Sequence, residues 1–215
     1  MYKLAIFDLD GTLVDTSRGI VNCYQHIIRE FGLIELSDNE IKKFIGQNLL
    51  KSIMVNFNVG EGIAQKAALS YRTRYKQKGI TEISLYDQLE ESLKLIKDHG
   101  CKLAIATLKK EEFAIQLFEN IGLIQYFDTI RGMSDGDSLT KSNIIDLCIN
   151  DVGIRDRREA VMVGDSIGDF LGAKESGIDF IAVTYGYGFN KYDHQEGEVQ
   201  RCDNLIQVAK YIISC

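Results

Sequence analysis

Proline is absent from this chain of 215 residues, which contains 19 glycines. Because proteins contain about 5% proline on average, the turns of this chain have to rely on Gly, Asn and Asp. Long apolar runs are absent as well, and no stretch approaches the length of a membrane span. The N-terminus lacks the basic flank and apolar core of a signal peptide. We therefore expect a cytoplasmic protein that has no membrane partner.

Cysteine is sparse and scattered, with five residues and no Cys-x-x-Cys pair. This pattern predicts free thiols in a reducing compartment and no zinc site. The formal net charge is -6 and no basic run occurs, which argues against a nucleic-acid polymer as a partner. The length suffices for one α/β domain with a modest insert. It does not decide between a monomer and a homodimer.

The residues after the first apolar run are the most informative part of the sequence. Residues 4–7 (LAIF) predict a buried strand, and Asp8, Asp10 and Gly11 follow it at once. Two carboxylates two residues apart, followed by a glycine, mark a sharp exit from a sheet. One acid can act there as a nucleophile while the other transfers protons. A carboxylate nucleophile implies an acyl-phosphate intermediate.

The next part of the chain, residues 16–80, carries helical periodicity and no strand signal. We interpret Asp15 as the N-cap of its first helix. Ser37 and Glu40 have the spacing of a capping box, which predicts the start of the second helix. Ile63 is expected on the inner face of the fourth. The expected helices cover about residues 16–31, 37–44, 48–57 and 61–77.

From residue 85 onward, predicted strands and helices alternate. We expect strands at 102–106, 129–130, 160–163 and 180–183. We expect helices at 88–99, 111–121, 140–150 and 167–176, and a final helix with Asp203 as its N-cap. Strands separated by helices predict an α/β fold with a doubly wound, Rossmann-like parallel sheet. Its core is expected to comprise residues 1–14 and 85–215, with residues 15–84 as an inserted four-helix domain.

Polar residues follow several of the predicted strands. Thr107 follows the strand at 102–106, and Asp165 follows the strand at 160–163. Because ligands of such sheets bind beyond the carboxyl ends of the strands, these residues should meet Asp8 and Asp10 on one rim. Asp165 and Asp169 are four residues apart, which puts both on one face at a helix start. Such carboxylates suit Mg²⁺.

The segment from Asp8 to Leu13 resembles the first motif, Asp-x-Asp-Gly-Thr-[Leu/Val], of the haloacid dehalogenase-like phosphohydrolase superfamily. Gly164 to Asp169 is similar to its fourth motif, Gly-Asp-[Ser/Thr]-x-x-Asp. The resemblance implies that Asp8 is the nucleophile and Asp10 the general acid/base. It implies Mg²⁺ binding by Asp8, Asp10, Asp165 and Asp169, the last as a ligand or an anchor. It implies phosphate binding by Gly11, Thr107, Leu108 and Lys141.

A lysine near the phosphate offsets its repulsion from the nucleophile. We favour Lys141, at the start of a predicted helix, over Lys109 or Lys110 for this role.

Residues 15–84 lie where members of the superfamily carry a helical cap that closes over the site. The stretches at 44–46, 71–80 and 172–188 are most similar to the phosphoglycolate phosphatase and 5′-nucleotidase-like branch. The partner is then a small phosphorylated metabolite. Substrate contacts are expected from the cap residues Gly46, Gln47, Lys51, Arg72 and Lys78.

The expected function is Mg²⁺-dependent hydrolysis of small phosphomonoesters through an aspartyl-phosphate. A β-phosphoglucomutase-like phosphotransferase shares the scaffold, and would pass the phosphoryl group to a sugar phosphate instead of water. A non-catalytic binding module on the same fold would bind metal without turnover. A dehalogenase is disfavoured because such enzymes lack the second acid of the first motif, which Asp10 provides here.

Overall fold

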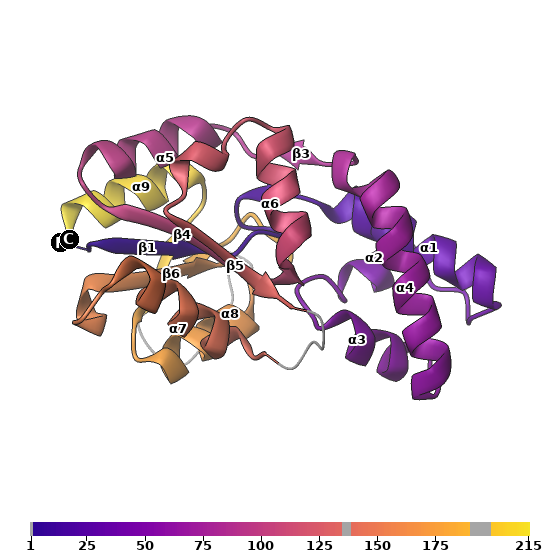
Figure 1. Ribbon diagram of the computed structural model, residues 1–215. Coiled ribbons are helices and arrows are strands. Elements are labelled where there is room, and N and C mark those ends of the chain that lie inside the picture. Colours follow the sequence, from indigo (N-terminus) through magenta and orange to yellow (C-terminus); the bar gives the residue numbers. More distant parts are fainter. Residues whose placement is uncertain (1, 135–138, 190–198) are drawn as a thin grey trace.

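The computed structural model describes residues 2–134, 139–189 and 199–215. A six-stranded sheet in the order β5-β4-β1-β6-β7-β8 forms its centre, and every pair of neighbours in it is parallel. Figure 1 shows helices packed on both faces of this sheet. The strands are β1 (Leu4–Phe7), β4 (Lys102–Lys110), β5 (Thr129–Met133), β6 (Ala160–Gly164), β7 (Asp179–Val183) and β8 (Gln200–Cys202).

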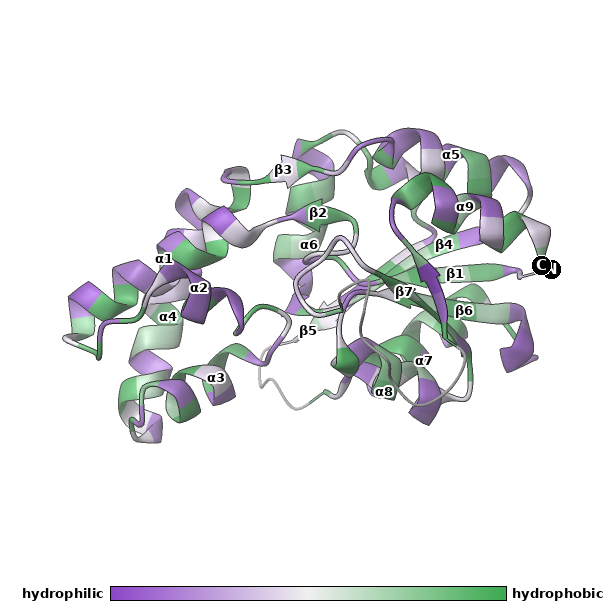
Figure 2. Cartoon of the chain, turned by 180° about the vertical axis from the view of Figure 1, so that it is seen from behind, coloured by the Kyte–Doolittle hydropathy of each residue, from purple (hydrophilic) through white to green (hydrophobic). Residues whose placement is uncertain are grey.

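The first strand lies in the middle of the sheet. Leu4 of β1 is in register with Lys102 of β4 and with Ala160 of β6, and all four residues of β1 are buried. A strand that is covered on both faces reads as a continuous apolar run. The hydropathy colouring of Figure 2 shows this for the central strands, whereas the helices alternate between hydrophobic and hydrophilic residues.

Helices cover the two faces of the sheet unequally. One apolar cluster joins β1, β4 and β6 to α5 (Leu89–Asp98), α6 (Glu111–Asn120) and α9 (Leu205–Ser214). A second cluster joins the same strands to α7 (Lys141–Val152) and α8 (Ile167–Ser176) on the opposite face. The predicted α/β fold with a parallel, Rossmann-like sheet is therefore confirmed.

Four helices lie together beyond one end of the sheet (Figure 1). They are α1 (Ser17–Phe31), α2 (Asp38–Lys42), α3 (Leu49–Asn56) and α4 (Glu61–Gln77). Two chain segments connect these helices to the sheet. They run side by side, because β2 (Val14–Asp15) in one pairs antiparallel with β3 (Ser84–Leu85) in the other. Aromatic rings fill the space between the helices, with Tyr24 in contact with Phe44, Phe57 and Tyr71. Short 3₁₀-helices occur at Gly79–Thr81, Ile124–Tyr126 and Arg157–Glu159.

Two predicted helix caps are wrong. Thr16, not Asp15, precedes α1, and Asp15 lies in β2, where its carboxylate accepts hydrogen bonds from the Ser17 N–H and the Tyr187 hydroxyl. Asn204, not Asp203, caps α9, and its side chain accepts from the Gln207 N–H at 3.0 Å. Asn204 has the extended backbone that a cap needs, whereas Thr16 precedes α1 without a capping hydrogen bond from its side chain.

Other expectations differ in detail. Ile63 is 48% exposed and does not belong to the inner face of α4. The strands β2, β3 and β8 were not predicted, since each has only two or three residues. The predicted capping box of Ser37 and Glu40 is confirmed. Across the described residues, no helix combines the length and the apolar character that crossing a membrane requires.

Candidate active site

Asp8 directly continues the central strand. Its backbone N–H donates to the Val163 carbonyl at 2.9 Å, which extends the β1–β6 pairing by one residue. Its side chain is buried, with the residue 5% exposed, and Oδ1 accepts a hydrogen bond from Lys141 Nζ at 2.6 Å. A fully buried central strand therefore holds the predicted nucleophile in a fixed position.

Three buried carboxylates converge at this end of the sheet. One oxygen each of Asp8, Asp165 and Asp169 lies within 4.8 Å of the others. Asp165 follows β6, and Asp169 lies in the first turn of α8, where its carboxylate accepts from the Ser166 N–H and hydroxyl in a capping box. Carboxylate oxygens are the ligands that hard divalent cations prefer. The cluster brings together three of the four predicted metal residues.

Lys141 is the only positive charge that the described contacts place inside this cluster. Its ammonium lies 2.6 Å from Asp8 and 2.7 Å from Asp169, and it also donates to the Ala106 carbonyl at 2.7 Å. Burial alone would lower the pKa of Lys141, but the two carboxylates raise it well above its ordinary value. Three carboxylates facing one ammonium leave a net charge that a divalent cation would neutralise, so these residues fit such an ion.

The protonation of the cluster depends on whether a divalent cation is bound. Burial raises the pKa of Asp8 far above its usual range, against the opposing effect of Lys141. Burial and the neighbouring Asp169 likewise raise the pKa of Asp165. A divalent cation reverses this tendency, because it favours the ionised carboxylates. Cation binding and proton release should therefore be coupled at this site.

Glycines make room for Asp165. A Cβ on Gly11, which has φ +88°, would lie 2.5 Å from Asp165 Oδ2, and a Cβ on Gly186 would lie at the same distance from that atom. The Tyr187 N–H donates to Oδ2 at 2.6 Å, and the Thr12 hydroxyl donates to Oδ1 at 3.3 Å. The N–H of Gly11 donates to the Val14 carbonyl at 3.0 Å. The Gly11 amide is thus hydrogen-bonded within this turn. The structure shows a steric role for Gly11 beside Asp165, and its contact with phosphate stays a prediction.

Asp10 is buried beside the cluster and has a different set of partners. Its Oδ1 accepts a hydrogen bond from the Thr16 hydroxyl at 2.5 Å and forms an ion pair with Lys109 at 2.9 Å. The side chain of Lys109 is only 8% exposed. Lys109 was considered only as an alternative to Lys141, but the structure places both lysines at the site, each on a different aspartate.

Thr107 and Leu108 lie near the end of β4, where its register with β5 is irregular. Thr107 is 1% exposed, and its hydroxyl oxygen accepts from the Lys109 N–H at 3.2 Å. Both residues line a cavity. This cavity opens between the end of β4, the helices α1, α3, α4 and α6, and the turn between α2 and α3. Its aromatic lining consists of Tyr24, Phe44, Tyr71, Tyr75 and Phe113.

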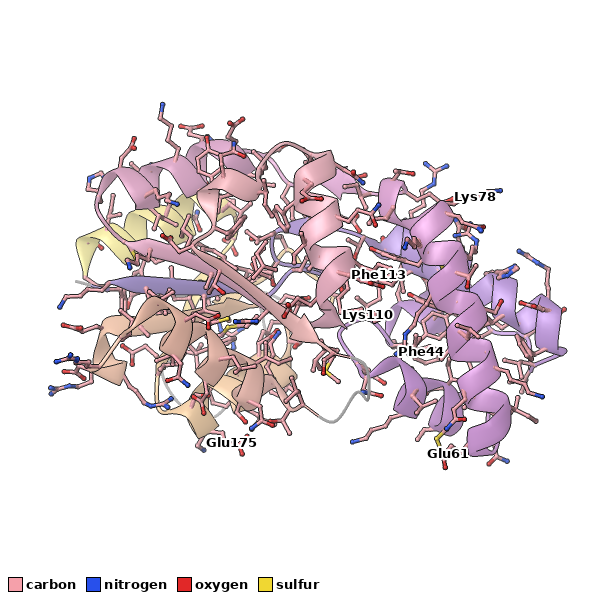
Figure 3. The ribbon with its side chains drawn as sticks, in the orientation of Figure 1. Phe44, Glu61, Lys78, Lys110, Phe113 and Glu175 are labelled. Carbon is pink, nitrogen blue, oxygen red and sulfur yellow. The ribbon has the colours of Figure 1, made fainter. Side chains whose placement is uncertain are left out.

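Three of the five predicted cap contacts line this cavity, namely Gly46, Gln47 and Arg72. Lys51 and Lys78 are not among the residues that line it. Lys78 instead borders a hollow between α1 and α4, and Figure 3 shows it away from Phe44 and Phe113. A second cavity joins Gly46 and Gln47 to Asp165, and Asp10 borders both.

Comparison with known proteins identifies the family. The family model described as haloacid dehalogenase-like hydrolase matches residues 5–183. The chain therefore belongs to the haloacid dehalogenase-like hydrolases, as its motifs predicted.

Several similar proteins carry the name of a phosphatase or a nucleotidase. A 5′-nucleotidase of Pseudomonas aeruginosa is 31% identical over 188 residues, which cover 87% of this chain and 85% of that protein. A phosphoglycolate phosphatase of Agrobacterium fabrum is 33% identical, with 86% and 81% covered. The crystal structure of a predicted phosphatase from Clostridium acetobutylicum is 33% identical, covers 100% of both chains and has a TM-score of 0.93. These similarities support the expected phosphoric monoester hydrolase.

Proposed function

We propose that this protein is a Mg²⁺-dependent phosphatase that hydrolyses small phosphomonoesters, of the phosphoglycolate or 5′-nucleotide kind, through an aspartyl-phosphate. The observation that carries the proposal is the buried group of Asp8, Asp165 and Asp169 around Lys141, with Asp10 next to it on a separate ion pair. A cytoplasmic location and a small phosphorylated metabolite as the partner belong to the same proposal.

The cation would be held by the carboxylates of Asp8, Asp165 and Asp169, and the family resemblance adds the backbone carbonyl of Asp10. When bound, Mg²⁺ supplies positive charge to the phosphoryl oxygens and neutralises the excess of carboxylates. Lys141 adds a fixed ammonium on the side of the cluster formed by Asp8 and Asp169. The Thr107 hydroxyl and the Leu108 backbone amide are proposed to donate to the phosphoryl oxygens.

Two aspartates then share the chemistry. The Asp8 carboxylate attacks phosphorus as the bond to the leaving oxygen breaks, and Asp10 gives its proton to that oxygen. In the second step Asp10 removes a proton from water, the water oxygen bonds to phosphorus, and the Asp8–phosphorus bond breaks. Because Asp8 is held by the sheet and by Lys141, little reorganisation is needed at the reacting atoms.

The helices α1–α4, within residues 15–84, are proposed to act as a cap that contacts the leaving group. Support comes from the cavity that the cap and the sheet line together, to which Asp10, Thr107 and Arg72 contribute. Closure of such a lid excludes water during the first step. Gly46 and Gln47 border both cavities at Asp10, so this turn is the best placed of the predicted cap contacts.

The test is phosphate release from phosphoglycolate, 5′-nucleotides and sugar phosphates, with Mg²⁺ and after chelation. We expect release only with the cation, and loss of turnover in Asp8→Asn. The matched control is Asp98→Asn at an exposed position at the end of α5, which should behave as wild type. Release by Asp8→Asn at the wild-type rate would contradict the proposal. Consumption of the phosphorylated intermediate by a sugar phosphate instead of water would identify a phosphotransferase.

A further inference from the structure

Lys109 is a buried cation that the proposed reaction does not use. It lies at the end of β4, and its ammonium contacts Asp10 Oδ1 at 2.9 Å with both side chains 8% exposed. Burying a lysine costs free energy unless its charge is paired. The Asp10 carboxylate supplies the opposite charge to this ammonium.

The contact fixes how the Asp10 carboxylate is turned. Lys109 and the Thr16 hydroxyl both engage Oδ1, from β4 and from the residue before α1. Two donors on one oxygen set the rotation of the carboxyl group about its last bond. The proton that Asp10 is to give and take is thereby assigned to Oδ2. A rotated carboxyl group would lose the alignment on which proton transfer depends.

Lys109 is in turn held by a residue of the helical insert. Its ammonium lies 4.6 Å from the centre of the Tyr75 ring, a cation–π contact. Tyr75 belongs to α4 and is 1% exposed. Its ring stacks on Tyr71 with an interplanar angle of 3° and lies 5.3 Å from the ring of Phe113 of α6. Tyr75 of α4 thus contacts Lys109, and Lys109 contacts Asp10, so these two contacts connect α4 to Asp10.

We propose that Lys109 is a positioning residue that orients Asp10 for proton transfer, and that Tyr75 of α4 holds it in that position. The inference rests on the proposed function, since it assigns Asp10 the proton transfer. It differs from the role of Lys141, which contacts the nucleophile Asp8 and not Asp10. It also predicts that displacement of α4 would weaken the acid/base without touching the nucleophile.

The decisive experiment compares two leaving groups in Lys109→Met. An alkyl phosphate needs a proton on its leaving oxygen, whereas p-nitrophenyl phosphate releases a weakly basic phenolate that needs none. Since general acid catalysis contributes about 10²–10⁴-fold, we expect the ratio of kcat/KM for the alkyl ester to that for the aryl ester to fall about 10- to 100-fold. Lys102→Met, at the exposed start of the same strand, should leave the ratio unchanged.

The outcomes of this comparison distinguish failure of the inference from failure of the proposed function. Equal losses of kcat/KM for both esters would overturn the inference, because a merely structural or phosphate-binding lysine affects both alike. No loss for either ester would overturn it as well. A wild-type protein that releases phosphate from neither ester would refute the proposed function, and the inference with it.

Variants of Tyr75 test the link to α4 separately. Tyr75→Leu removes the ring and should lower the alkyl-to-aryl ratio in the same direction as Lys109→Met. The two effects should not add in the double variant, because both act through the same contact. Tyr75→Phe keeps the ring and removes only the hydroxyl, which lies beside the Lys109 ammonium. Because we propose that the ring holds Lys109, this variant should retain the wild-type ratio. Additive effects would refute the link through Tyr75.

Discussion

Gly172 of α8 provides a sharp test of how Lys141, the proposed catalytic lysine, is held. A Cβ at this position would lie 2.7 Å from Lys141 Cγ and 2.9 Å from its Cβ. Ordinary van der Waals contact begins at 3.4 Å. In Gly172→Ala, therefore, either the Lys141 side chain or α8 itself has to move by several tenths of an ångström. The Lys141 side chain cannot move without lengthening these contacts, because its ammonium makes three of them at 2.6–2.7 Å.

The size of the effect follows from two opposing contributions. Replacing Gly by Ala in a helix interior stabilises it by about 1 kcal/mol, whereas overpacking a tight contact costs about 1–3 kcal/mol. The free energy of unfolding should then fall by no more than about 2 kcal/mol, so the protein remains folded. The activity is more sensitive, since a misplacement of about 1 Å at a reacting centre can cost 10²-fold. We expect kcat of Gly172→Ala to fall about 10- to 100-fold.

The assay is the rate of phosphate release at saturating substrate and Mg²⁺, measured together with thermal unfolding. The matched control is Gly62→Ala in α4, where a Cβ would meet nothing within 4 Å. That variant should keep kcat and gain a little stability. A Gly172→Ala protein with wild-type kcat would refute the reasoning, because it would mean that close packing against α8 does not fix Lys141.

Two further predictions concern the cation. Gly11→Ala places a Cβ 2.5 Å from Asp165 Oδ2 at a φ of +88°, so calorimetric titration should show weaker Mg²⁺ binding, and unchanged affinity would contradict this steric role. Because burial raises the pKa values of Asp8 and Asp165 in the folded state, the metal-free fold binds more protons than the unfolded chain. Its stability should therefore fall as the pH rises above the unfolded carboxyl pKa of about 4. The increase in Tm on adding Mg²⁺ should be larger at pH 8 than at pH 5, and the reverse order would refute the assignment.

Features encoded by local pattern were predictable from the sequence. The predicted fourth helix has the bounds of α4, Glu61–Gln77, and its buried positions recur at helical spacing, namely Ala64, Ala67, Ala68, Tyr71 and Tyr75. The carboxylates that follow β1 and β6 were placed on one rim because parallel strands end on the same side of a sheet. This rule needs only that the strands run parallel, which the alternation of strands and helices along the chain predicts.

Features that depend on distant partners were not predictable. The strand β8, Gln200–Cys202, has no apolar run, and it is a strand only because β7 offers it a free edge. Lys109 stands in the polar end of β4, between Leu108 and Lys110, and local pattern gives no sign that it is buried. Its burial depends on Tyr75, which packs over it from a helix in another part of the chain. No periodicity of either segment reveals that contact.

The charges at the site explain why the cation and the substrate should depend on each other. Each of the two neighbouring acids of the first motif has its own ammonium, from β4 for one and from α7 for the other. When all the acids are ionised, four negative charges face two positive ones, from Asp8, Asp10, Asp165, Asp169, Lys109 and Lys141. A phosphate dianion would double this excess of negative charge in a buried site, which is costly unless it is compensated. One divalent cation removes the excess before the substrate enters, so each ligand should raise the affinity of the other.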